Sequence, residues 1–403
     1  MESIIINLLD FLFWVLGIYL LINCLYLLFF ALAGLFSLPP LQKQAAVYKK
    51  IALLFPTYKE NTVIIESVRS ALTHHYNGLF EVVVIADGLQ AETNTMLKQM
   101  GAKVIEVFFE KSTKGKAMRF GMEKLQDDGF DIAMVLDVDN VLGTDCLNYI
   151  NSYFVQGNKV IQVHRTAKDV DTSFAYLDAC NEEVNNQIYR KGHAVMGLSA
   201  TLIGSGMAFD FSYFYHLLNA VGETIGEDKK LDFLIAKDKI KVAYLNEVYV
   251  YDEKVENAQV FTNQRTRWIA SQIEFLKLYA FEGLRELFRG NFEFFNKTLQ
   301  TFLVPRILLL ALLFVMAAQS FFNPIGPSQE FWTALFLCIC FTLLIAIPKR
   351  FYADKRLYLA ILQIPRAMIG MVIALLSIGK AKKSFMVTPH QSKTVKTNEP
   401  PCQ

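Results

Sequence analysis

Long apolar runs lie at both ends of this 403-residue chain, and a mixed, charged stretch separates them. Residues 4–38 form the first run, in which Asp10 is the only side chain of the Asp, Glu, Lys and Arg types. A bilayer core of about 30 Å requires roughly 20 apolar residues in a helix, so this run predicts a membrane span. A cleaved signal peptide is the alternative, but it would begin with basic residues and have a shorter apolar stretch.

Three further apolar segments follow the charged middle. Residues 302–322 predict a second full span, and residues 331–347 predict a third near the short limit. The last segment, 358–378, contains Pro365 and Arg366, and a central arginine costs roughly 2.5 to 3.5 kcal/mol on insertion scales. This segment is either a fourth span or an interfacial or re-entrant helix. The second alternative is favoured because it keeps the basic tail on the cytoplasmic side.

The distribution of charge predicts the orientation. Lys43, Lys49 and Lys50 are the first basic residues and follow the first span. The positive-inside rule therefore places the middle of the chain in the cytoplasm and the N-terminus outside an inner or plasma membrane. Six cysteines without paired spacing predict no zinc site, and a net charge of +2 gives no reason to expect a nucleic-acid partner.

The middle of the chain alternates short apolar runs with segments of helical spacing. Strands are predicted at 51–55, 80–86, 103–107 and 132–136, and helices at 63–72, 92–100 and 116–125. This alternation indicates a parallel sheet with helices on both faces. Ligands of such sheets bind beyond the carboxyl ends of the strands, so polar residues there should meet at one edge. These residues are Thr57, Glu60, Asp87, Asp137 and Asp139.

Asp137-Val138-Asp139 directly follows the fourth predicted strand. An extended chain points alternate side chains the same way, so both carboxylates are expected to face one side. Paired carboxylates with room for water and a diphosphate suit Mg²⁺ or Mn²⁺. An ordinary acidic turn is the alternative.

Two helix starts also carry charged residues. Lys114 can meet a nucleotide's phosphate or base, or it can be a solvated charge, but the rest of a P-loop pattern is missing. Glu227 and Asp228 precede a helical stretch at 231–236. One interpretation is that they cap the helix and interact favourably with the positive end of its dipole. The other is that Asp228 acts as a general base that takes a proton from an acceptor hydroxyl.

Gln264-Arg265-Thr266-Arg267-Trp268 lies in a helical stretch that begins near residue 258. Gln264, Arg267 and Trp268 share one face of that helix. A guanidinium group suits a diphosphate, and an indole can stack on a sugar. An amphipathic helix lying on lipid could carry the same residues.

The ordered motifs together resemble family 2 glycosyltransferases, specifically the membrane-embedded branch with cellulose, hyaluronan and poly-N-acetylglucosamine synthases. The resemblance covers about residues 51–268 and extends to the flanking membrane segments. The motifs that carry it are Pro56-Thr57-Tyr58-Lys59-Glu60, Ala86-Asp87-Gly88, Asp137-Val138-Asp139, Glu227-Asp228 and Gln264 to Trp268. It implies an α/β, Rossmann-like A-type glycosyltransferase domain with a mixed, mainly parallel sheet, flanked by transmembrane helices.

The resemblance also implies roles for the matched residues. Asp87 is expected to contact the uracil or ribose, Asp137 to lie near the nucleotide and the metal, and Asp139 to bind the metal. Asp228 is the expected base, with Glu227 beside it in the catalytic pair. The other expected nucleotide-sugar contacts are Thr57, Glu60, Lys114, Gln264, Arg265, Arg267 and Trp268. Gly204, Ser205, Gly206 and Trp268 are expected on the acceptor side.

The implied activity is inverting transfer from a UDP-sugar to a hydroxyl of a growing polysaccharide, with a β-linkage formed at a membrane. Transfer of one sugar to a lipid or lipid-linked acceptor is the alternative, and a non-catalytic membrane subunit is a third. Two departures from the branch are Gly226, where threonine is common, and a smaller number of spans than polymer-secreting members usually have. The sequence identifies neither the sugar nor any export or accessory subunit.

These observations divide the chain into five predicted regions. They are an N-terminal transmembrane helix at 1–40, a cytoplasmic transferase domain at 45–282, an interfacial amphipathic segment at 283–300, a membrane region at 301–380 and a cytoplasmic tail at 381–403. Residues 385–390 in the tail also resemble a short motif that follows the last membrane segment of such enzymes.

Overall fold

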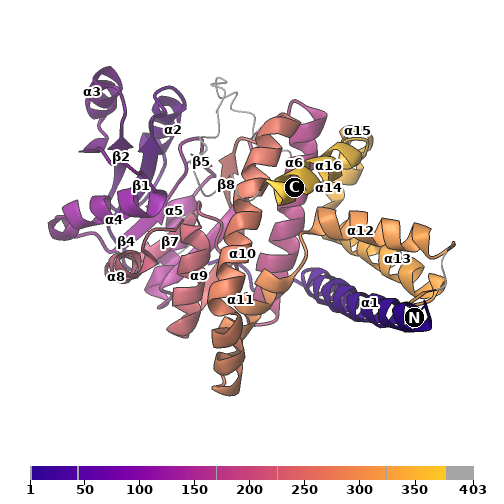
Figure 1. Cartoon of the computed structure of the whole chain (residues 1–403). Helices are drawn as coiled ribbons and strands as arrows, with labels where there is room; N and C mark the ends of the chain where they lie inside the picture. Colours follow the sequence, from indigo (N-terminus) through magenta and orange to yellow (C-terminus); the bar gives the residue numbers. More distant parts are fainter. Residues whose placement is uncertain (1, 43–44, 169, 225, 323–324, 378–403) are drawn as a thin grey trace. The chain divides into compact units, whose positions relative to one another are not determined.

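The computed structural model describes all residues except 1, 43–44, 169, 225, 323–324 and 378–403 (Figure 1). The predicted tail and its motif at 385–390 therefore lie outside the described residues. Contacts within the chain define two compact units. The sheet unit comprises Pro40–Asp169 and Thr201–Glu253, and the helical unit comprises Met1–Pro39, Val170–Ala200 and the described part of Lys254–Met386.

The sheet unit is built on one eight-stranded mixed sheet with the order β3-β2-β1-β4-β7-β6-β8-β5. The strands are β1 Ile51–Tyr58, β2 Phe80–Asp87, β3 Lys103–Val107, β4 Ile132–Val135, β5 Val141–Leu142, β6 Val160–Ala167, β7 Met207–Asp210 and β8 Val242–Asp252. β7 runs antiparallel to β4 and β6, β5 runs antiparallel to β8, and the remaining described pairs are parallel. The predicted mixed, mainly parallel sheet is confirmed.

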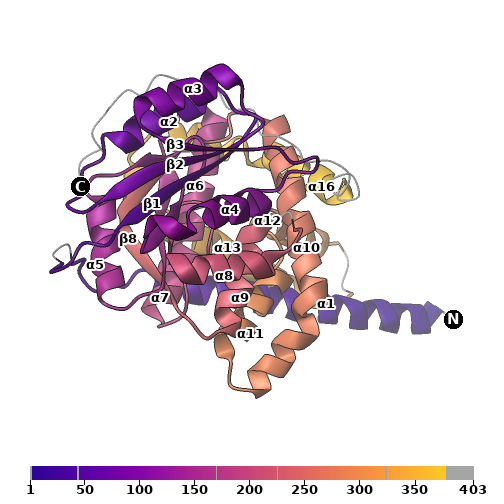
Figure 2. The same ribbon diagram turned by 90° about the vertical axis from the view of Figure 1, so that its left-hand side faces the viewer.

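Helices cover both faces of this sheet. Figure 2 shows α2 and α3 on one side of the strands and α4 and α8 on the other. These helices and two more are α2 Val63–Leu72, α3 Ala91–Met100, α4 Lys114–Lys124, α5 Cys146–Val155, α8 Phe211–Val221 and α9 Glu227–Lys237. A sheet covered on both faces needs strands with continuous apolar runs, and residues 51–55 of β1 and 82–86 of β2 are such runs.

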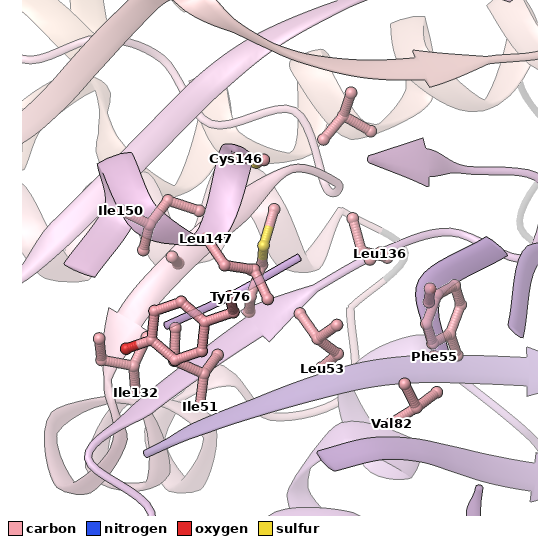
Figure 3. Close-up of a cluster of buried hydrophobic side chains, with 14 of the residues drawn as sticks. Ile51, Leu53, Phe55, Tyr76, Val82, Ile132, Leu136, Cys146, Leu147 and Ile150 are labelled. Carbon is pink, nitrogen blue, oxygen red and sulfur yellow. The ribbon is translucent and has the colours of Figure 1, made fainter. Parts of the chain in front are cut away.

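The core of the sheet unit forms where α2, α3 and α5 pack on the strands. Figure 3 shows the part of it that lies between the strands and α5. Ile51, Leu53 and Phe55 alternate along β1 and are fully buried there. Leu147 and Ile150 of α5 join the same cluster. Burying each of these side chains stabilises the fold by about 1.5 to 3 kcal/mol, so the sheet is a firm platform for the residues at its edge.

The helical unit contains the apolar ends of the chain. Its elements are α1 Glu2–Ala33, α6 Ser173–Asn185, the π-helix η2 Asn186–Gly192, α7 His193–Val195, α10 Ala258–Phe288, α11 Phe292–Phe302, α12 Arg306–Gln319, α13 Gln329–Ala346, α14 Lys349–Tyr352, α15 Arg356–Ile361 and α16 Ile364–Leu376. Among the described residues, Ser3–Ala33, Gln329–Ala346 and Arg356–Leu376 are long and apolar enough to cross a membrane. The bent pair α11 and α12 is a candidate for a fourth span.

The second predicted span, at 302–322, is not one continuous helix. α11 and α12 meet at an angle of 55°, and α12 alone has 14 residues. The break falls at residues 303–305 because Pro305 lacks an N–H group and disfavours the helical conformation at Val304.

Side chains from two other helices satisfy the backbone groups at this break. Asn23 Oδ1 of α1 accepts a hydrogen bond from Val304 N at 2.7 Å. Gln272 Nε2 of α10 donates to the carbonyl oxygens of Thr301 at 3.1 Å and Leu303 at 2.7 Å. An irregular backbone is tolerated in apolar surroundings only when such partners are present.

Candidate active site

The ends of β1, β2 and β4 place the first acidic residues at one edge of the sheet. Tyr58 pairs with Asp87 in the β1–β2 register, and Asp137 follows β4 on the other side of β1. Asp87 is 1% exposed, and Ser112 Oγ donates a hydrogen bond to its Oδ2. The expectation that strand ends gather these residues is confirmed, and Ser112 is an addition that the sequence did not indicate.

Thr57 and Glu60 lie near the same edge and have local hydrogen-bond partners. Thr57 is buried, and its hydroxyl donates to the Phe55 carbonyl oxygen at 3.1 Å. Glu60 Oε1 accepts from the backbone N–H groups of Thr62 at 3.0 Å and Val63 at 3.3 Å, at the start of α2. Their contact with a nucleotide stays a prediction.

The prediction of an extended segment from Asp137 to Asp139 is wrong. β4 ends at Val135, and Asn140 N donates to the Asp137 carbonyl oxygen at 3.1 Å, which closes a turn. Asp139 is buried and accepts hydrogen bonds from Asn140 Nδ2 and Glu253 N, both at 3.0 Å. Asp137 instead faces two cationic side chains.

Lys114 and Arg165 are these cations, and they approach different oxygens of Asp137. Lys114 Nζ contacts Asp137 Oδ1 and donates to the Gly204 carbonyl oxygen at 2.6 Å. Arg165 Nη1 lies 4.0 Å from Asp137 Oδ2, and its Nε lies 3.4 Å from Asp252 Oδ2. Arg165 and Asp252 were not predicted from the sequence. Asp252 ends β8, so the strand-end rule would have indicated it had that strand been predicted.

Glu227 and Asp228 begin α9 and meet Lys114 beside Gly204. A Cβ atom on Gly204 would lie 3.7 Å from both Glu227 Oε1 and Lys114 Nζ, and 3.9 Å from Asp228 Oδ2. Gly204 has a φ of +80°, a conformation that favours glycine. Glu227 is buried and lies 3.9 Å from Lys114 Nζ, whereas Asp228 is only partly buried. The structure therefore brings together four of the predicted residues, Lys114, Gly204, Glu227 and Asp228.

Burial and neighbouring charges shift two of these groups. Burial raises the pKa of Glu227 to about 7, with Lys114 acting to lower the pKa and Asp228 to raise it. Burial acts to lower the pKa of Lys114, but the carboxylates of Asp137 and Glu227 outweigh it and the net pKa is raised. Lys114 therefore stays charged at neutral pH, whereas Glu227 gains or loses its proton near pH 7.

The predicted acceptor-side residues form a turn that is tied to the Asp137 turn. Asp137 N donates to Ser205 Oγ at 3.1 Å, and Ser205 Oγ in turn donates to Asn140 Oδ1. Gln162 Nε2 donates to the carbonyl oxygens of Ser205 at 2.9 Å and Gly206 at 3.1 Å. These bonds fix the position of the glycine-rich turn, and its contact with an acceptor stays a prediction.

The Gln264 to Trp268 motif lies on α10 in the helical unit. Arg265 is buried, its Nη2 lies 2.5 Å from Asp178 Oδ1, and its guanidinium is 3.9 Å from the Trp268 ring centroid. Gln264 and Arg267 are partly buried, and Trp268 is 40% exposed. Arg265 is thus occupied inside its own unit, whereas the face with Gln264, Arg267 and Trp268 is more open.

The sheet edge offers oxygen ligands for a divalent cation. No cluster of three or more acidic, histidine or cysteine ligands occurs in the part of the chain that is described. Magnesium-like ions commonly take one or two carboxylates and complete their shell with phosphate and water. The carboxylates of Asp137 and Asp139 fit that chemistry.

A family model described as "Glycosyltransferase like family 2" matches residues 49–271, more than half of the chain. The chain belongs to this family. It is therefore an enzyme, a glycosyltransferase, and the family predicted from the motifs is confirmed. No curated protein matches the sequence.

Solved structures similar to this glycosyltransferase have low sequence identity. A mannosyltransferase from Pyrobaculum calidifontis, in complex with GDP-Man and Mn²⁺, has a TM-score of 0.54 and 14% identity, with 93% of this chain and 100% of that chain covered. S. aureus TarS has a TM-score of 0.38 and 13% identity, with 82% of this chain and 91% of that chain covered. The first likeness confirms the predicted A-type glycosyltransferase fold.

Proposed function

We propose that this glycosyltransferase is a membrane-bound inverting enzyme that moves a sugar from a nucleotide diphosphate, UDP in the leading case, to an acceptor hydroxyl. The observation that carries the proposal is the meeting of Lys114, Glu227 and Asp228 beside Gly204, next to Asp137 at the strand ends. Cationic and acidic groups at such an edge suit a diphosphate leaving group and a hydroxyl that must lose a proton.

Asp228 is the proposed general base. It is more accessible than Glu227, which is buried and lies beside Lys114. Asp228 takes the acceptor proton while the hydroxyl oxygen attacks the anomeric carbon. The bond from that carbon to the diphosphate oxygen breaks, and the electron pair leaves with the diphosphate. Attack from the opposite face converts an α-linked donor into a β-linked product.

The remaining residues bind and orient the donor in this proposal. Asp87 contacts the base or ribose, and Lys114 and Arg165, which flank Asp137, offset charge on the diphosphate. Mg²⁺ or Mn²⁺ held by Asp137 and Asp139 supplies further positive charge to the leaving group when it is bound. Arg267 adds to this charge, and Trp268 stacks on the acceptor sugar.

Replacement of the base tests the mechanism. Asp228→Asn is expected to reduce UDP release at least 100-fold, because general base catalysis contributes about 10² to 10⁴ in rate. Binding of the nucleotide sugar should persist, since the amide preserves the size of the side chain. Asp238→Asn, at the other end of α9, is the matched control and should retain activity. Near-normal turnover of Asp228→Asn would remove Asp228 from the role of base.

A growing polysaccharide is the proposed acceptor, and single transfer to a lipid or lipid-linked acceptor is the second candidate. The second candidate is favoured by the span count, which is three among the described residues and four at most if the bent pair is included. So few helices leave little material for a polymer channel within one chain. A radiolabelled donor separates the two, since polymerisation gives a ladder of products and single transfer gives one species.

The donor is also open to direct test. UDP release or GDP release from a panel of UDP- and GDP-linked sugars, each with Mg²⁺ or Mn²⁺, would identify the nucleotide and the sugar. Stimulated release by a single donor supports the proposed donor site. No release from any donor by purified, folded protein would contradict the assigned chemistry.

A further inference from the structure

Arg306 opens the apolar helix α12, and its hydrogen bonds all go to neutral groups among the described residues. Its Nη2 donates to Asn181 O at 3.2 Å, Asn181 Oδ1 at 2.7 Å and Asn185 Oδ1 at 2.8 Å. Its Nη1 is buried and has no hydrogen-bond partner within the described chain. Amide oxygens solvate a guanidinium group but leave its charge uncompensated.

The charged groups around Arg306 do not balance it. Arg265 and Arg190 lie close enough to act on it electrostatically, and Glu182 acts on it with the opposite sign. Glu182 Oε1 already accepts from Arg190 Nη1 at 3.1 Å, and Asp178 already pairs with Arg265 at 2.5 Å. Each of these two carboxylates therefore already pairs with another arginine. A desolvated cation whose hydrogen bonds go only to neutral groups, with one buried nitrogen unbonded, is unfavourable, and this indicates that an anion completes the site.

The position of Arg306 in its helix supports the same conclusion. The first backbone bond of α12 runs from Leu309 N to the Pro305 carbonyl at 2.9 Å. The preceding N–H groups of the first turn are without intrahelical partners and form the positive end of the helix dipole. Arg306 adds positive charge to this positive end of the helix. An anionic oxygen would accept hydrogen bonds from the unbonded N–H groups and would also neutralise the guanidinium group.

The surroundings of this cationic end indicate the source of the anion. α12 is apolar after Arg306, and its Phe314 and Val315 side chains are 58% and 54% exposed. The helix also belongs to a candidate membrane span. A ligand whose phosphate contacts Arg306 and whose apolar chains follow α12 has the chemistry of a membrane lipid.

We propose that Arg306, the amides of Asn181 and Asn185 and the N-terminus of α12 bind the headgroup phosphate of an anionic lipid. The lipid neutralises the third arginine of the cluster and stabilises the junction of α6, α10 and α12. None of these residues is the proposed general base or a proposed metal ligand, so the site can be tested without a nucleotide sugar.

The first test measures the melting temperature of the full chain, purified in detergent and stripped of lipid. Short-chain phosphatidic acid is expected to raise Tm by about 5 °C near saturation. Phosphatidylcholine of the same chain length and inorganic phosphate at the same concentration should have little effect. Arg306→Gln should lose the response. Arg366→Gln, which alters an exposed arginine bonded only to Gln363 among the described residues, should keep it.

A second variant guards against simple misfolding of Arg306→Gln. Asn185→Asp preserves the shape of the side chain and places a carboxylate 2.8 Å from Arg306 Nη2. It is expected to raise Tm without lipid and to abolish the response to phosphatidic acid. A full response in Asn185→Asp would overturn the site. Equal stabilisation of the unaltered chain by inorganic phosphate would overturn the assignment to a lipid.

Discussion

Glu227 is the residue whose charge state is most sensitive to its surroundings at the sheet edge. Its side chain is 12% exposed, and its Oε1 lies 3.9 Å from Lys114 Nζ. Burial outweighs that favourable contact and raises its pKa to about 7. The folded protein therefore holds a proton on Glu227 over a pH range in which an unfolded chain would release it.

This shift gives a pH-dependent stability with a definite sign. The folded-state pKa of Glu227 is raised, so the unfolding free energy should fall as pH rises from about 4.5 to about 7. Glu227→Gln removes this fall in unfolding free energy, because glutamine does not titrate. The Tm of the variant minus the Tm of the unaltered chain should therefore increase from pH 5 to pH 8. The difference is on the order of 2 kcal/mol.

Glu223→Gln is the control for that comparison. Glu223 is exposed, and a hydrogen bond from Lys116 lowers its pKa, so its charge should not change between pH 5 and pH 8. A Glu227→Gln Tm difference that is flat over this range would contradict the raised pKa.

The acidic motifs and Lys114 could be predicted from the sequence because each follows an apolar run or opens a helix. Their partners could not, because Ser112, Gln162 and Arg165 have no such signal in one sequence. The orientation of Asp139 also depends on tertiary contacts, since the turn at Asn140 and the Glu253 N–H group hold it.

Two elements approach each other unusually closely where α1 meets the π-helix η2. A Cβ atom on Gly192 would lie 2.1 Å from the Phe30 carbonyl oxygen, and one on Gly34 would lie 2.6 Å from the Gln187 carbonyl oxygen. Both obstacles are backbone atoms, which cannot rotate away. Small residues at helix contacts allow this packing, so the two glycines are required by the approach of the elements.

Gly192→Ala is therefore expected to destabilise the helical unit by about 1 to 3 kcal/mol, the usual range for overpacking. Gly370→Ala is the control, because its Cβ would meet side-chain atoms rather than backbone, namely Thr262 Oγ1 at 2.8 Å and Phe261 Cδ1 at 3.7 Å. Thermal unfolding in detergent measures both. A loss of Tm in Gly370→Ala equal to or greater than that in Gly192→Ala would contradict the backbone contact.

Periodicity predicted some elements well and omitted others. β1 to β4 and α2 to α4 have long apolar or helical patterns, and their bounds are close to the predicted ones. β7 contains an apolar run of only three residues, 207–209, whereas the run that predicted β4 has five, 132–136. The valine and tyrosine residues of β8 were an available signal. The break before α12 was also signalled by Pro305, but the apolar composition around it favoured one span.

At the scale of the whole chain, the proposed topology places the N-terminus outside and the transferase motifs in the cytoplasm. The candidate spans then fix the side of each connection. A fluorescent reporter that matures only in the cytoplasm can be fused after a chosen residue. It is expected to be bright after residues 290, 350 and 403, and dark after residue 322. A dark reporter after 403 would make Arg356–Leu376 a span, and one after 290 would contradict the orientation.

The bond between Asn23 and Val304 also bears on how the chain is made. The two residues are 281 positions apart, and ribosomes add about 5 to 20 residues per second. The Asn23 amide therefore reaches the membrane about 15 to 60 s before its partner is synthesised. During that interval a neighbouring helix, water or an insertion factor must occupy its place. The yield of folded enzyme in a cell then depends on the pace of translation between these residues.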